Sequence, residues 1–410
     1  MSISRGRNQN IIKAHNVSAI LLELLQSKLV SRVELAKILS LSNTTITNLI
    51  AELLEEEVIS EVEIPVESKR QRVGRPRRML RLIPDARFAI GVHIGVGIFR
   101  VAITDLFAKV IHNRINHFEL GSSFETVIQD IHSVITQTID HAGIDPQRIL
   151  GIGVGASGLV DTTKGVNVVA PRLKWVNVPF KELLQSYSNY PVCVDNNVRS
   201  MALGEALFGS GRDVDVLAFV YGRIGVGAGF VVNGELYRGS SAGAGEIGHT
   251  VIIPQGGEVC GCGNTGCLET LISEPVLLKE AQSIAKRNPD SILAKELKKT
   301  GKNIPIEQVF AAARGGDRET IEMIEQMSCY LGIALANLIN IVNPELIIVG
   351  GMFAQGQDLI LPKAEEKMRQ LAFAGLGENV KIVPTKFGWQ AGVIGAASLA
   401  LYSFFYQPTE

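Results

Sequence analysis

The amino-acid sequence predicts an α/β protein that carries a separate, smaller unit at its N-terminal end. From Ala89 onward, apolar segments that end in glycine alternate with helical segments, and this alternation is typical of an α/β fold. Residues 1–84 lack it and combine helical segments with two short alternating ones. With 410 residues, the chain is long enough for two or three domains of roughly 150 residues each.

Three helices are predicted in the N-terminal unit. The start of the short second helix is marked by Ser31 and Glu34, which form a capping box. Ser42 follows a brief turn and is placed to cap the third helix. The side chains expected in the core are Ile20, Leu21, Leu24 and Leu25 on the first helix, and Ile46, Leu49, Ile50, Leu53 and Leu54 on the third.

Small hydrogen-bonding side chains gather at the start of this third helix. Two helices around a short turn, with such side chains on the second, are typical of a helix-turn-helix that enters the DNA major groove. Residues 58–66 and 77–83 alternate like the two strands of a wing, with basic residues between them. The side chains expected to contact DNA are Asn43, Thr44, Thr45, Thr47 and Asn48 on the helix, and Arg75 and Arg77 in the wing.

The alternative for this unit is a helical interaction domain with a solvated basic loop. The combination of capping box, tight turn, polar helix start and basic wing favours DNA binding instead. Residues 69–81 contain seven Lys or Arg and no acid. Arg75 lies within the stiff bend of Gly74 and Pro76, which suits insertion into a narrow minor groove. The other basic residues would contact phosphates and contribute affinity without specificity.

The composition excludes wholesale disorder, because 46% of the residues are hydrophobic and 20% are charged. The first residues lack the apolar stretch of a secretory signal. Five cysteines, three of them between positions 260 and 267, do not have the pattern of a disulfide framework. We therefore expect a reducing, cytoplasmic location.

One segment raises the alternative of a membrane span. Residues 387–409 are uncharged and largely apolar. However, Gly392, Gly395, Ser398 and Ser403 interrupt the segment, and no basic cluster flanks it. Such small residues favour a helix that is buried in close contact with its neighbours. We therefore expect no association with a membrane.

Glycine loops recur at the ends of the strands predicted in residues 89–105, 149–161, 216–236 and 345–351. A single Gly-x-Gly is weak support for a ligand site, because glycine also simply forms turns. Several such strand ends in one α/β chain indicate a ligand in the crevice that they border.

The strongest local chemistry lies in residues 245–270. His249, Cys260, Cys262 and Cys267 provide one imidazole and three thiolates, the ligand set of a closed tetrahedral zinc site. The alternative is a set of reduced surface thiols in a glycine loop. Because exposed free thiols are chemically reactive, this alternative is disfavoured. Because four protein ligands leave no open position for a substrate, we predict a structural Zn²⁺ ion.

With these motifs in place, the chain resembles the ROK family (repressors, open reading frames, kinases), and specifically its sugar-responsive repressor branch. The resemblance is carried by the winged unit, GLVD at 158–161, VDNNVRSMALGEALFG at 194–209, GELYRGSSAGAGEIGH at 234–249 and CGCGNTGCLET at 260–270. It implies a winged helix-turn-helix over 1–84 followed by an actin-like bilobal α/β domain. One lobe is expected over 85–197 plus 386–410, and the second, with the zinc loop, over 198–385.

The resemblance also implies a sugar site in the cleft between the lobes. Asn196, Glu246, His249 and Glu269 match positions that contact the sugar. Carboxylates and amides suit this role because they form directional hydrogen bonds with vicinal hydroxyls. The alternative for either glutamate is an ordinary surface acid.

Three departures from the kinases of the family point away from catalysis. Asn197 stands where the kinases have the Asp that accepts the proton of the sugar hydroxyl, and an amide cannot accept it. His93 replaces an Asp of the phosphate loop, and Ile98 replaces a Thr. Asp195 would lie roughly 6–7 Å further back along its strand. We therefore predict no catalytic residue, although an ATP-dependent sugar kinase of the hexokinase or glucokinase type remains the alternative.

Arg172 stands where the kinases have a sugar-binding Asn. It is either a solvated residue at the rim or a ligand for a phosphate or carboxylate of the effector. Trp175 either stacks on a sugar or belongs to the core. The predicted function is a transcriptional repressor that binds a double-stranded operator and responds to a sugar or sugar phosphate. A homodimer or homotetramer is expected because such proteins contact paired half-sites. A further alternative is that a partner protein, and not a sugar, is the main regulator of this repressor.

Overall fold

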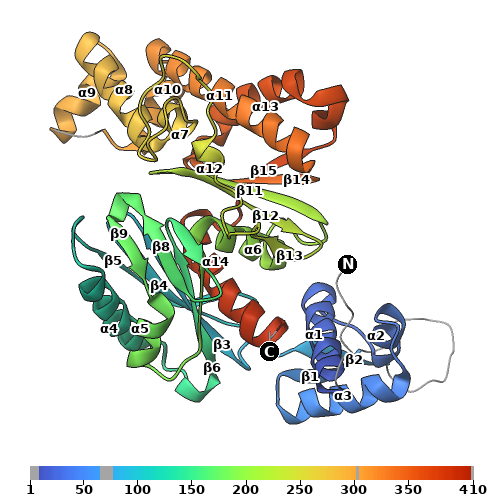
Figure 1. Cartoon of the computed structure of the whole chain (residues 1–410). Coiled ribbons are helices and arrows are strands. Elements are labelled where there is room, and N and C mark those ends of the chain that lie inside the picture. The colour runs from blue at the N-terminus through green and yellow to red at the C-terminus, as the bar shows by residue number, and fades with distance from the viewer. Residues whose placement is uncertain (1–8, 65–76, 302–303, 408–410) are drawn as a thin grey trace.

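The computed structural model describes residues 9–64, 77–301 and 304–407. It consists of a small winged unit and two larger α/β lobes, stacked one above the other as Figure 1 shows. The winged unit lies beside the first lobe, next to the C-terminal end of the chain.

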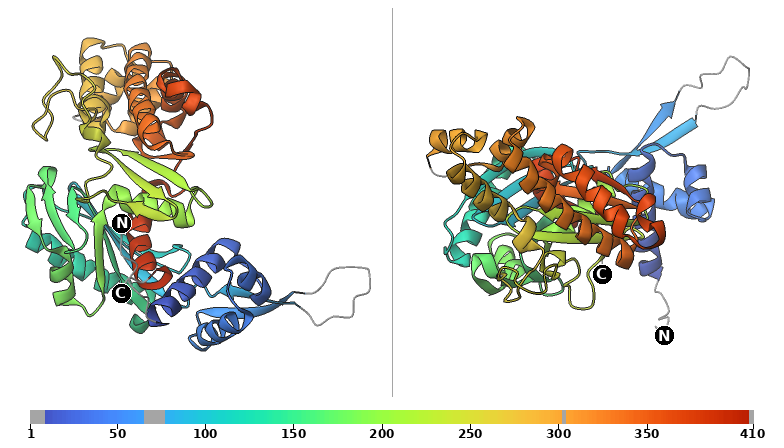
Figure 2. Two further views of the ribbon diagram at one scale, coloured as in Figure 1. Left: turned by 45° about the vertical axis from the view of Figure 1, so that its right-hand side comes forward. Right: turned by 90° about the horizontal axis from the view of Figure 1, so that it is seen from above.

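The winged unit has the predicted helix-turn-helix and hairpin. The capping box of Ser31 and Glu34 is formed, and the Ser42 side chain accepts a hydrogen bond from the backbone N–H of Thr45. The hairpin pairs Ile59 with Leu82 and Ile64 with Arg77, and it projects away from the rest of the molecule (Figure 2). The elements are α1 (Gln9–Ser27), α2 (Arg32–Ile38), α3 (Asn43–Glu55), β1 (Ile59–Ile64) and β2 (Arg77–Leu82).

The core expected for this unit is confirmed, with one difference. The predicted side chains of α1 and α3 are buried, except that Leu54 is half-buried at the edge of the cluster. Leu80 and Leu82 of the wing close the same core from the other side. The helices and the wing therefore form one packed body.

The first lobe is built on a five-stranded sheet with the order β10-β6-β3-β4-β5. Helices α4 and α5 cover one face, and a small antiparallel sheet, β7-β8-β9, follows β6. The bounds are β3 (Phe88–Gly95), β4 (Ile98–Thr104), β5 (Val110–His117), α4 (Phe124–Ala142), β6 (Ile149–Ala156), β7 (Leu159–Asp161), β8 (Val166–Ala170), β9 (Trp175–Val178), α5 (Phe180–Tyr187) and β10 (Val192–Asn196).

The second lobe contains a sheet with the order β13-β12-β11-β14-β15 and a cluster of helices on its outer face. Along β11, Ala218 and Val220 face these helices, whereas Leu217 and Phe219 face α6. The bounds are β11 (Val216–Gly222), β12 (Val226–Val232), β13 (Glu235–Tyr237), α7 (Glu269–Ile272), α8 (Glu274–Arg287), α9 (Ile292–Thr300), α10 (Ile306–Arg314), α11 (Arg318–Val342), β14 (Leu346–Gly351), α12 (Met352–Gln355), α13 (Gln357–Leu371) and β15 (Lys381–Pro384).

Two helices, α6 (Asn197–Phe208) and α14 (Ala391–Leu401), lie between the sheets (Figure 1). Every residue of α14 is buried, which confirms the prediction of a closely packed helix. The close packing requires glycine, because a Cβ at Gly153 of β6 would lie 1.9 Å from the carbonyl oxygen of Ala396. Among the described residues, no helix is long and apolar enough to cross a membrane.

The winged unit is joined to the rest of the chain through the end of α14. Leu401 and Tyr406 belong to the same apolar cluster as the helices of the winged unit. Arg212, in the loop between α6 and β11, donates hydrogen bonds to the carbonyl oxygens of Leu25 (2.7 Å) and Gln26 (3.1 Å) at the end of α1. The DNA-binding candidate therefore contacts segments that belong to both lobes.

Candidate functional site

The start of α3 presents the polar side chains that the sequence singled out. Asn43, Thr44, Thr47 and Asn48 are exposed. Thr45 is half-buried, and its hydroxyl lies 2.8 Å from the hydroxyl of Ser42, so it takes part in the helix cap. The exposed four are available to a partner along one side of the helix start.

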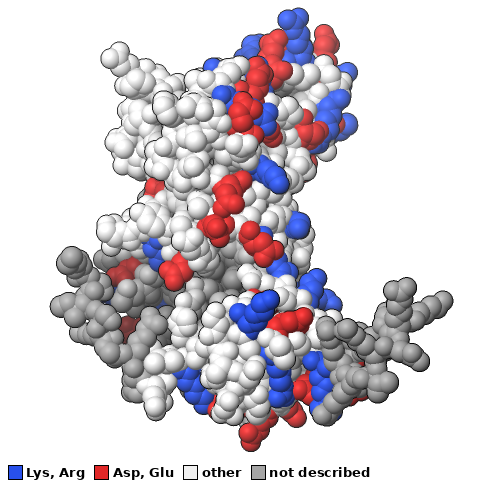
Figure 3. All heavy atoms as spheres, turned by 90° about the vertical axis from the view of Figure 1, so that its right-hand side faces the viewer, with Lys and Arg blue, Asp and Glu red and all other residues white. Residues whose placement is uncertain are grey.

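The wing adds charge next to this helix. Glu61 of β1 accepts hydrogen bonds from Arg32 (2.7 Å) and from Arg78 (3.1 Å), so these two arginines are already paired. Arg75 lies outside the described residues, and for Arg77 only the backbone of β2 is described. On the face shown in Figure 3, the described Lys and Arg are mixed with Asp and Glu and form no large patch of one sign.

The four predicted metal ligands lie together in the second lobe. One ligand atom from each of His249, Cys260, Cys262 and Cys267 falls within 4.8 Å of the others. His249 Nδ1 is 3.5 Å from Cys260 Sγ, and Cys262 Sγ is 3.8 Å from Cys267 Sγ. The described residues therefore contain a His/Cys3 cluster whose donor atoms suit a metal ion.

Backbone pairing folds the loop into this cluster. Val251 pairs with Cys267, and Val259 pairs with Thr265. Gly266 has a φ of +73°, and a Cβ at this position would lie 1.8 Å from the carbonyl oxygen of Ile253. Any larger residue at position 266 would therefore clash with the backbone of Ile253, which packs against this loop.

The acids that flank the cluster differ in their surroundings. Glu246 is exposed, and its carboxylate lies 4.0 Å from Nε2 of His249. Partial loss of hydration raises the pKa of Glu246, while His249 and Arg199 act in the opposite direction. Glu269, at the start of α7, is buried. Glu246 is therefore open to solvent, whereas Glu269 is shielded from it.

Glu269 is engaged in an ion pair that spans the two lobes. Nη2 of Arg172, in the loop between β8 and β9, lies 2.7 Å from Oε1 of Glu269. The other carboxylate oxygen accepts a hydrogen bond of 3.3 Å from the backbone N–H of Val226. Two side chains that were predicted to contact the ligand thus contact each other, an arrangement that neither sequence interpretation of Arg172 anticipated.

Asn196 acts as the N-cap of α6. Its Oδ1 accepts hydrogen bonds from the N–H groups of Val198 (2.8 Å) and Arg199 (3.2 Å). Its Nδ2 donates to the carbonyl oxygen of Gly158 (2.9 Å). All of these bonds serve the junction of β10 and α6, so the contact of Asn196 with a sugar stays a prediction.

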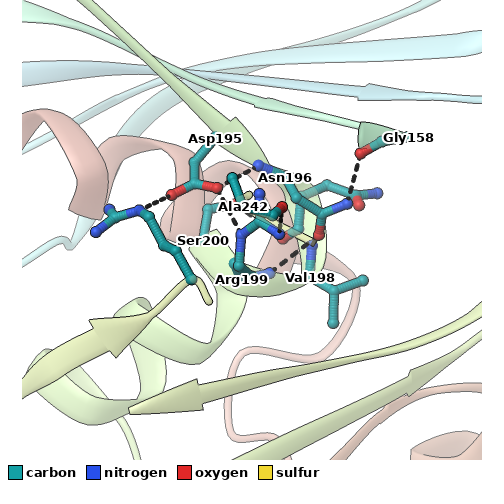
Figure 4. Close-up of polar contacts among 9 residues, drawn as sticks. Gly158, Asp195, Asn196, Val198, Arg199, Ser200 and Ala242 are labelled. Carbon is teal, nitrogen blue, oxygen red and sulfur yellow. Dashed lines mark hydrogen bonds and ion pairs between the residues drawn. The ribbon is translucent and has the colours of Figure 1, made fainter. Parts of the chain in front are cut away.

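Asp195 is held by two arginines, as Figure 4 shows in part. It is 1% exposed, and it accepts hydrogen bonds from Nε of Arg199 (2.7 Å) and Nε of Arg238 (2.8 Å). Arg199 also donates to the carbonyl oxygen of Ala242 (2.7 Å), which ties α6 to the loop before Glu246. Asp195 therefore joins α6 to β13 and the loop that follows it through these two arginines.

Two further residues that the sequence analysis singled out are Asn197 and Trp175. Nδ2 of Asn197 lies 3.2 Å from Oγ of Ser157, beside the glycine loop after β6. Trp175 is 5% exposed and stacks against Phe118 in the core of the first lobe. Trp175 is therefore a core residue, as one of its two interpretations stated.

Two arginines of this region, Arg199 and Arg238, were missed by the sequence analysis. Arg199 lies four residues after Asp195, and this spacing was the available signal, because it places the two side chains on one side of a helix start. Arg238 is 43 residues away from its partner, and no local pattern marks it.

Comparison with known proteins agrees with this architecture. A model of the ROK family matches residues 89–402. The xylose repressor of Caldicellulosiruptor bescii is 32% identical over 395 residues, which are 96% of this chain and 97% of that protein.

Two solved structures of ROK family proteins resemble this chain in fold. A ROK family transcriptional regulator, described as a homolog of the E. coli MLC protein, matches with a TM-score of 0.82 and 30% identity over 96% of this chain and 98% of that one. A ROK family glucokinase from Streptomyces griseus, in complex with glucose and AMPPNP, matches with a TM-score of 0.69 and 27% identity. It covers 76% of this chain and 98% of its own.

Proposed function

This chain belongs to the ROK family, and from that premise we propose that it is a transcriptional repressor whose operator binding is controlled by a sugar or sugar phosphate. The observation that carries the proposal is the exposed polar start of α3 next to the projecting wing. The relatives named as regulators match 96% of the chain, which includes this unit, whereas the glucokinase matches 76%.

The DNA-binding role assigns α3 to the major groove and the wing to the adjacent minor groove. Asn43, Thr44, Thr47 and Asn48 would contact base edges or phosphates, and Arg75 and Arg77 would enter the minor groove. The test is selection of binding sites from random double-stranded DNA, followed by measurement of affinity at several salt concentrations. Binding that lacks sequence preference would remove the support for a repressor.

We propose that the sugar binds between the lobes, against Glu246, His249 and Glu269. We propose that a sugar hydroxyl bonds to Glu269 in place of Arg172, which holds the same carboxylate in the structure. Binding would thus exchange a contact between the lobes for contacts with the ligand. A ligand shifts an equilibrium only through its difference in affinity for the two states.

The His/Cys3 cluster is proposed to hold a structural Zn²⁺ ion. The ion would supply four bonds that fix the loop between Glu246 and Glu269, and it would leave no coordination position for a substrate. His249 then has one ring nitrogen for the metal and the other, Nε2, on the side of Glu246. Measurement of the zinc content of the purified protein tests this assignment.

We expect no kinase activity. Asn197 offers an amide at the position of the catalytic base, and the carboxylate of Asp195 is buried and bonded to two arginines. The alternative, an ATP-dependent sugar kinase, is favoured only by the resemblance to the glucokinase. Incubation with Mg-ATP and a panel of hexoses and pentoses distinguishes the two, since a kinase would release ADP in a sugar-dependent manner.

The repressor would act in the cytoplasm, where operator DNA is accessible. Two copies of the winged unit would contact the two halves of an inverted repeat, so a homodimer or homotetramer is expected. Light scattering of the protein, with and without its operator, measures the number of subunits.

A further inference from the structure

The C-terminal end of α1 is completed by a side chain from a distant part of the chain. The last carbonyl groups of an α-helix have no partner within the helix, and they carry a partial negative charge. In α1, the carbonyl oxygens of Leu25 and Gln26 accept hydrogen bonds from Nη2 of Arg212, at 2.7 and 3.1 Å. The carbonyls on either side, of Leu24 and Ser27, are bonded to backbone N–H groups of the turn that follows. Because α1 has no basic residue in its own last turn, Arg212 supplies the positive charge that stabilises this helix end.

The loop that carries Arg212 is tightly bonded to the end of α6. Glu205, in the last turns of α6, is buried. Its carboxylate accepts a hydrogen bond from the backbone N–H of Ser210 (2.8 Å), and its carbonyl oxygen accepts from those of Gly209 and Gly211 (both 3.0 Å). A Cβ at Gly209 would lie 2.0 Å from Oε2 of Glu205, so a larger residue there would displace this carboxylate. These contacts fix Arg212 relative to α6.

α6 begins at the region proposed to bind the sugar. Asn196 caps its first turn, and Arg199 donates to the carbonyl oxygen of Ala242, in the loop before Glu246. The middle of the helix is buried, so we expect α6 to move as one body. At about 1.5 Å per residue, its 12 residues span roughly 18 Å. A displacement at the start of α6 would therefore also displace Arg212 beyond its end.

The winged unit is held on the first lobe by separate bonds. The backbone N–H of Ile83, after β2, bonds to the carbonyl oxygen of Val58 in the winged unit (3.0 Å). The next residue, Pro84, accepts a hydrogen bond from the N–H of Leu106 in the first lobe (2.9 Å). A shift of α6 relative to the first lobe would therefore change the contact between Arg212 and α1.

We propose that Arg212 couples the sugar site to the winged unit through α6. Its Nη2 uses both N–H donors on the two carbonyls of α1, so these bonds depend closely on the position of the loop. A shift of α6 that accompanies sugar binding breaks them and loosens the end of α1. The inference rests on the proposed function, because it names how the response to the sugar reaches the DNA-binding helices.

The first measurement is hydrogen exchange of the full chain with neither sugar nor DNA present, because exchange detects local opening. Exchange at residues 24–29 is compared between the wild type, Arg212→Gln and Arg212→Lys, which keeps a cation that can donate to both carbonyls. Arg114→Gln is the matched control, because Arg114 is bonded to Gln137 and His141 within the first lobe.

We expect exchange at the end of α1 to be about tenfold faster in Arg212→Gln and close to the wild-type rate in Arg212→Lys. Exchange in α3 should be the same in every variant, which shows that the winged unit stays folded. Wild-type exchange rates at residues 24–29 in Arg212→Gln would contradict the proposal.

The second measurement is operator binding, with and without a sugar or sugar phosphate that releases the wild type. Paired half-sites require winged units at a fixed spacing, so Arg212→Gln should bind the operator about fivefold more weakly than the wild type in the absence of sugar. The factor by which the sugar lowers operator affinity should fall from about tenfold in the wild type to about threefold or less, although the variant still binds the sugar. Arg212→Lys and Arg114→Gln should keep the wild-type factor.

The outcomes separate this inference from the proposed function. If the sugar releases Arg212→Gln with the wild-type factor, the inference fails while the proposed function stands. Faster exchange at α1 together with an unchanged factor would show that Arg212 only caps the helix, and this result also overturns the inference. If no sugar or sugar phosphate releases the wild type, the proposed function fails, and the role of Arg212 in the response fails with it.

Discussion

Arg172 and Glu269 join the two lobes through an ion pair of 2.7 Å, although 97 residues separate them in the sequence. Glu269 is buried and lies two residues after the metal-ligand candidate Cys267. The pair therefore connects the small sheet of the first lobe to the loop that holds the His/Cys3 cluster. A ligand that replaces Arg172 at Glu269 would break this connection.

The first prediction concerns competition for Glu269. Arg172→Gln should raise the affinity for a neutral sugar by up to about fivefold, because the pair is partly exposed and contributes about 1 kcal/mol or less. Glu269→Gln should lower the affinity at least tenfold. Calorimetric titration of both variants measures this, and a loss of neutral-sugar affinity in Arg172→Gln would show that Arg172 is itself a ligand of the sugar.

The second prediction concerns DNA. Asn48→Ala should weaken binding to a selected operator by about tenfold, because a side-chain hydrogen bond to a base contributes roughly 1–3 kcal/mol. The double variant of Arg75 and Arg77 to Ala should weaken binding most at A·T-rich sites and reduce the salt dependence. Glu55→Ala, at the far end of α3, serves as the control. Unchanged affinity in the double variant at all salt concentrations would refute the role of the wing.

The third prediction concerns the metal. Cys262→Ala should lose zinc, lower the unfolding temperature and make operator binding insensitive to the sugar, because Glu246 and Glu269 flank the loop. The winged unit should stay folded, since its core is formed with α14 and not with the zinc loop. Cys329→Ala, which alters a cysteine outside the cluster, is the control. A zinc-free variant that is released from DNA at the wild-type sugar concentration would make the metal irrelevant to sensing.

The fourth prediction concerns pH. The pKa of His93 is lowered from 6.5 to about 3 in the folded protein, first by burial and then by Arg100 and Arg223. Below pH 6.5 the unfolded chain therefore binds a proton that the folded protein does not, and stability is lost as the pH falls. Between pH 7 and 5 the wild type should lose about 2 kcal/mol more than His93→Gln.

Denaturant titrations at the two pH values measure this difference, with the exposed His117 replaced by Gln as the control. If the free energy of unfolding changes equally with pH in the wild type and in His93→Gln, the pKa of His93 is not lowered in the folded protein.

The local features of this molecule could be predicted from the sequence. The caps at Ser31 and Ser42, the buried stripes of α1 and α3 and the Cys-x-Cys-x4-Cys loop depend on residues within a few positions of one another. Because such contacts need only local geometry, residue type and spacing suffice to predict them.

The contacts between distant segments could not be predicted in this way. The pairs of Arg172 with Glu269 and of Arg238 with Asp195 depend on how the lobes are placed. Asn196 caps α6, a role that its place before the helix favours, and its assignment to a sugar stays a prediction. The departure from the kinase pattern at His93 was visible in the sequence, but the positive charges of Arg100 and Arg223 near this residue were not.

The central claim is that a sugar or sugar phosphate controls binding to an operator, and one measurement tests it most directly. Fluorescence anisotropy of a labelled operator, selected with the wild-type protein, is followed while sugars and sugar phosphates are added to wild-type and Glu269→Gln proteins. We predict that at least one of these compounds lowers operator affinity of the wild type by tenfold or more, and that Glu269→Gln requires a much higher concentration. A wild-type protein that keeps its operator affinity with every sugar and sugar phosphate would contradict the account.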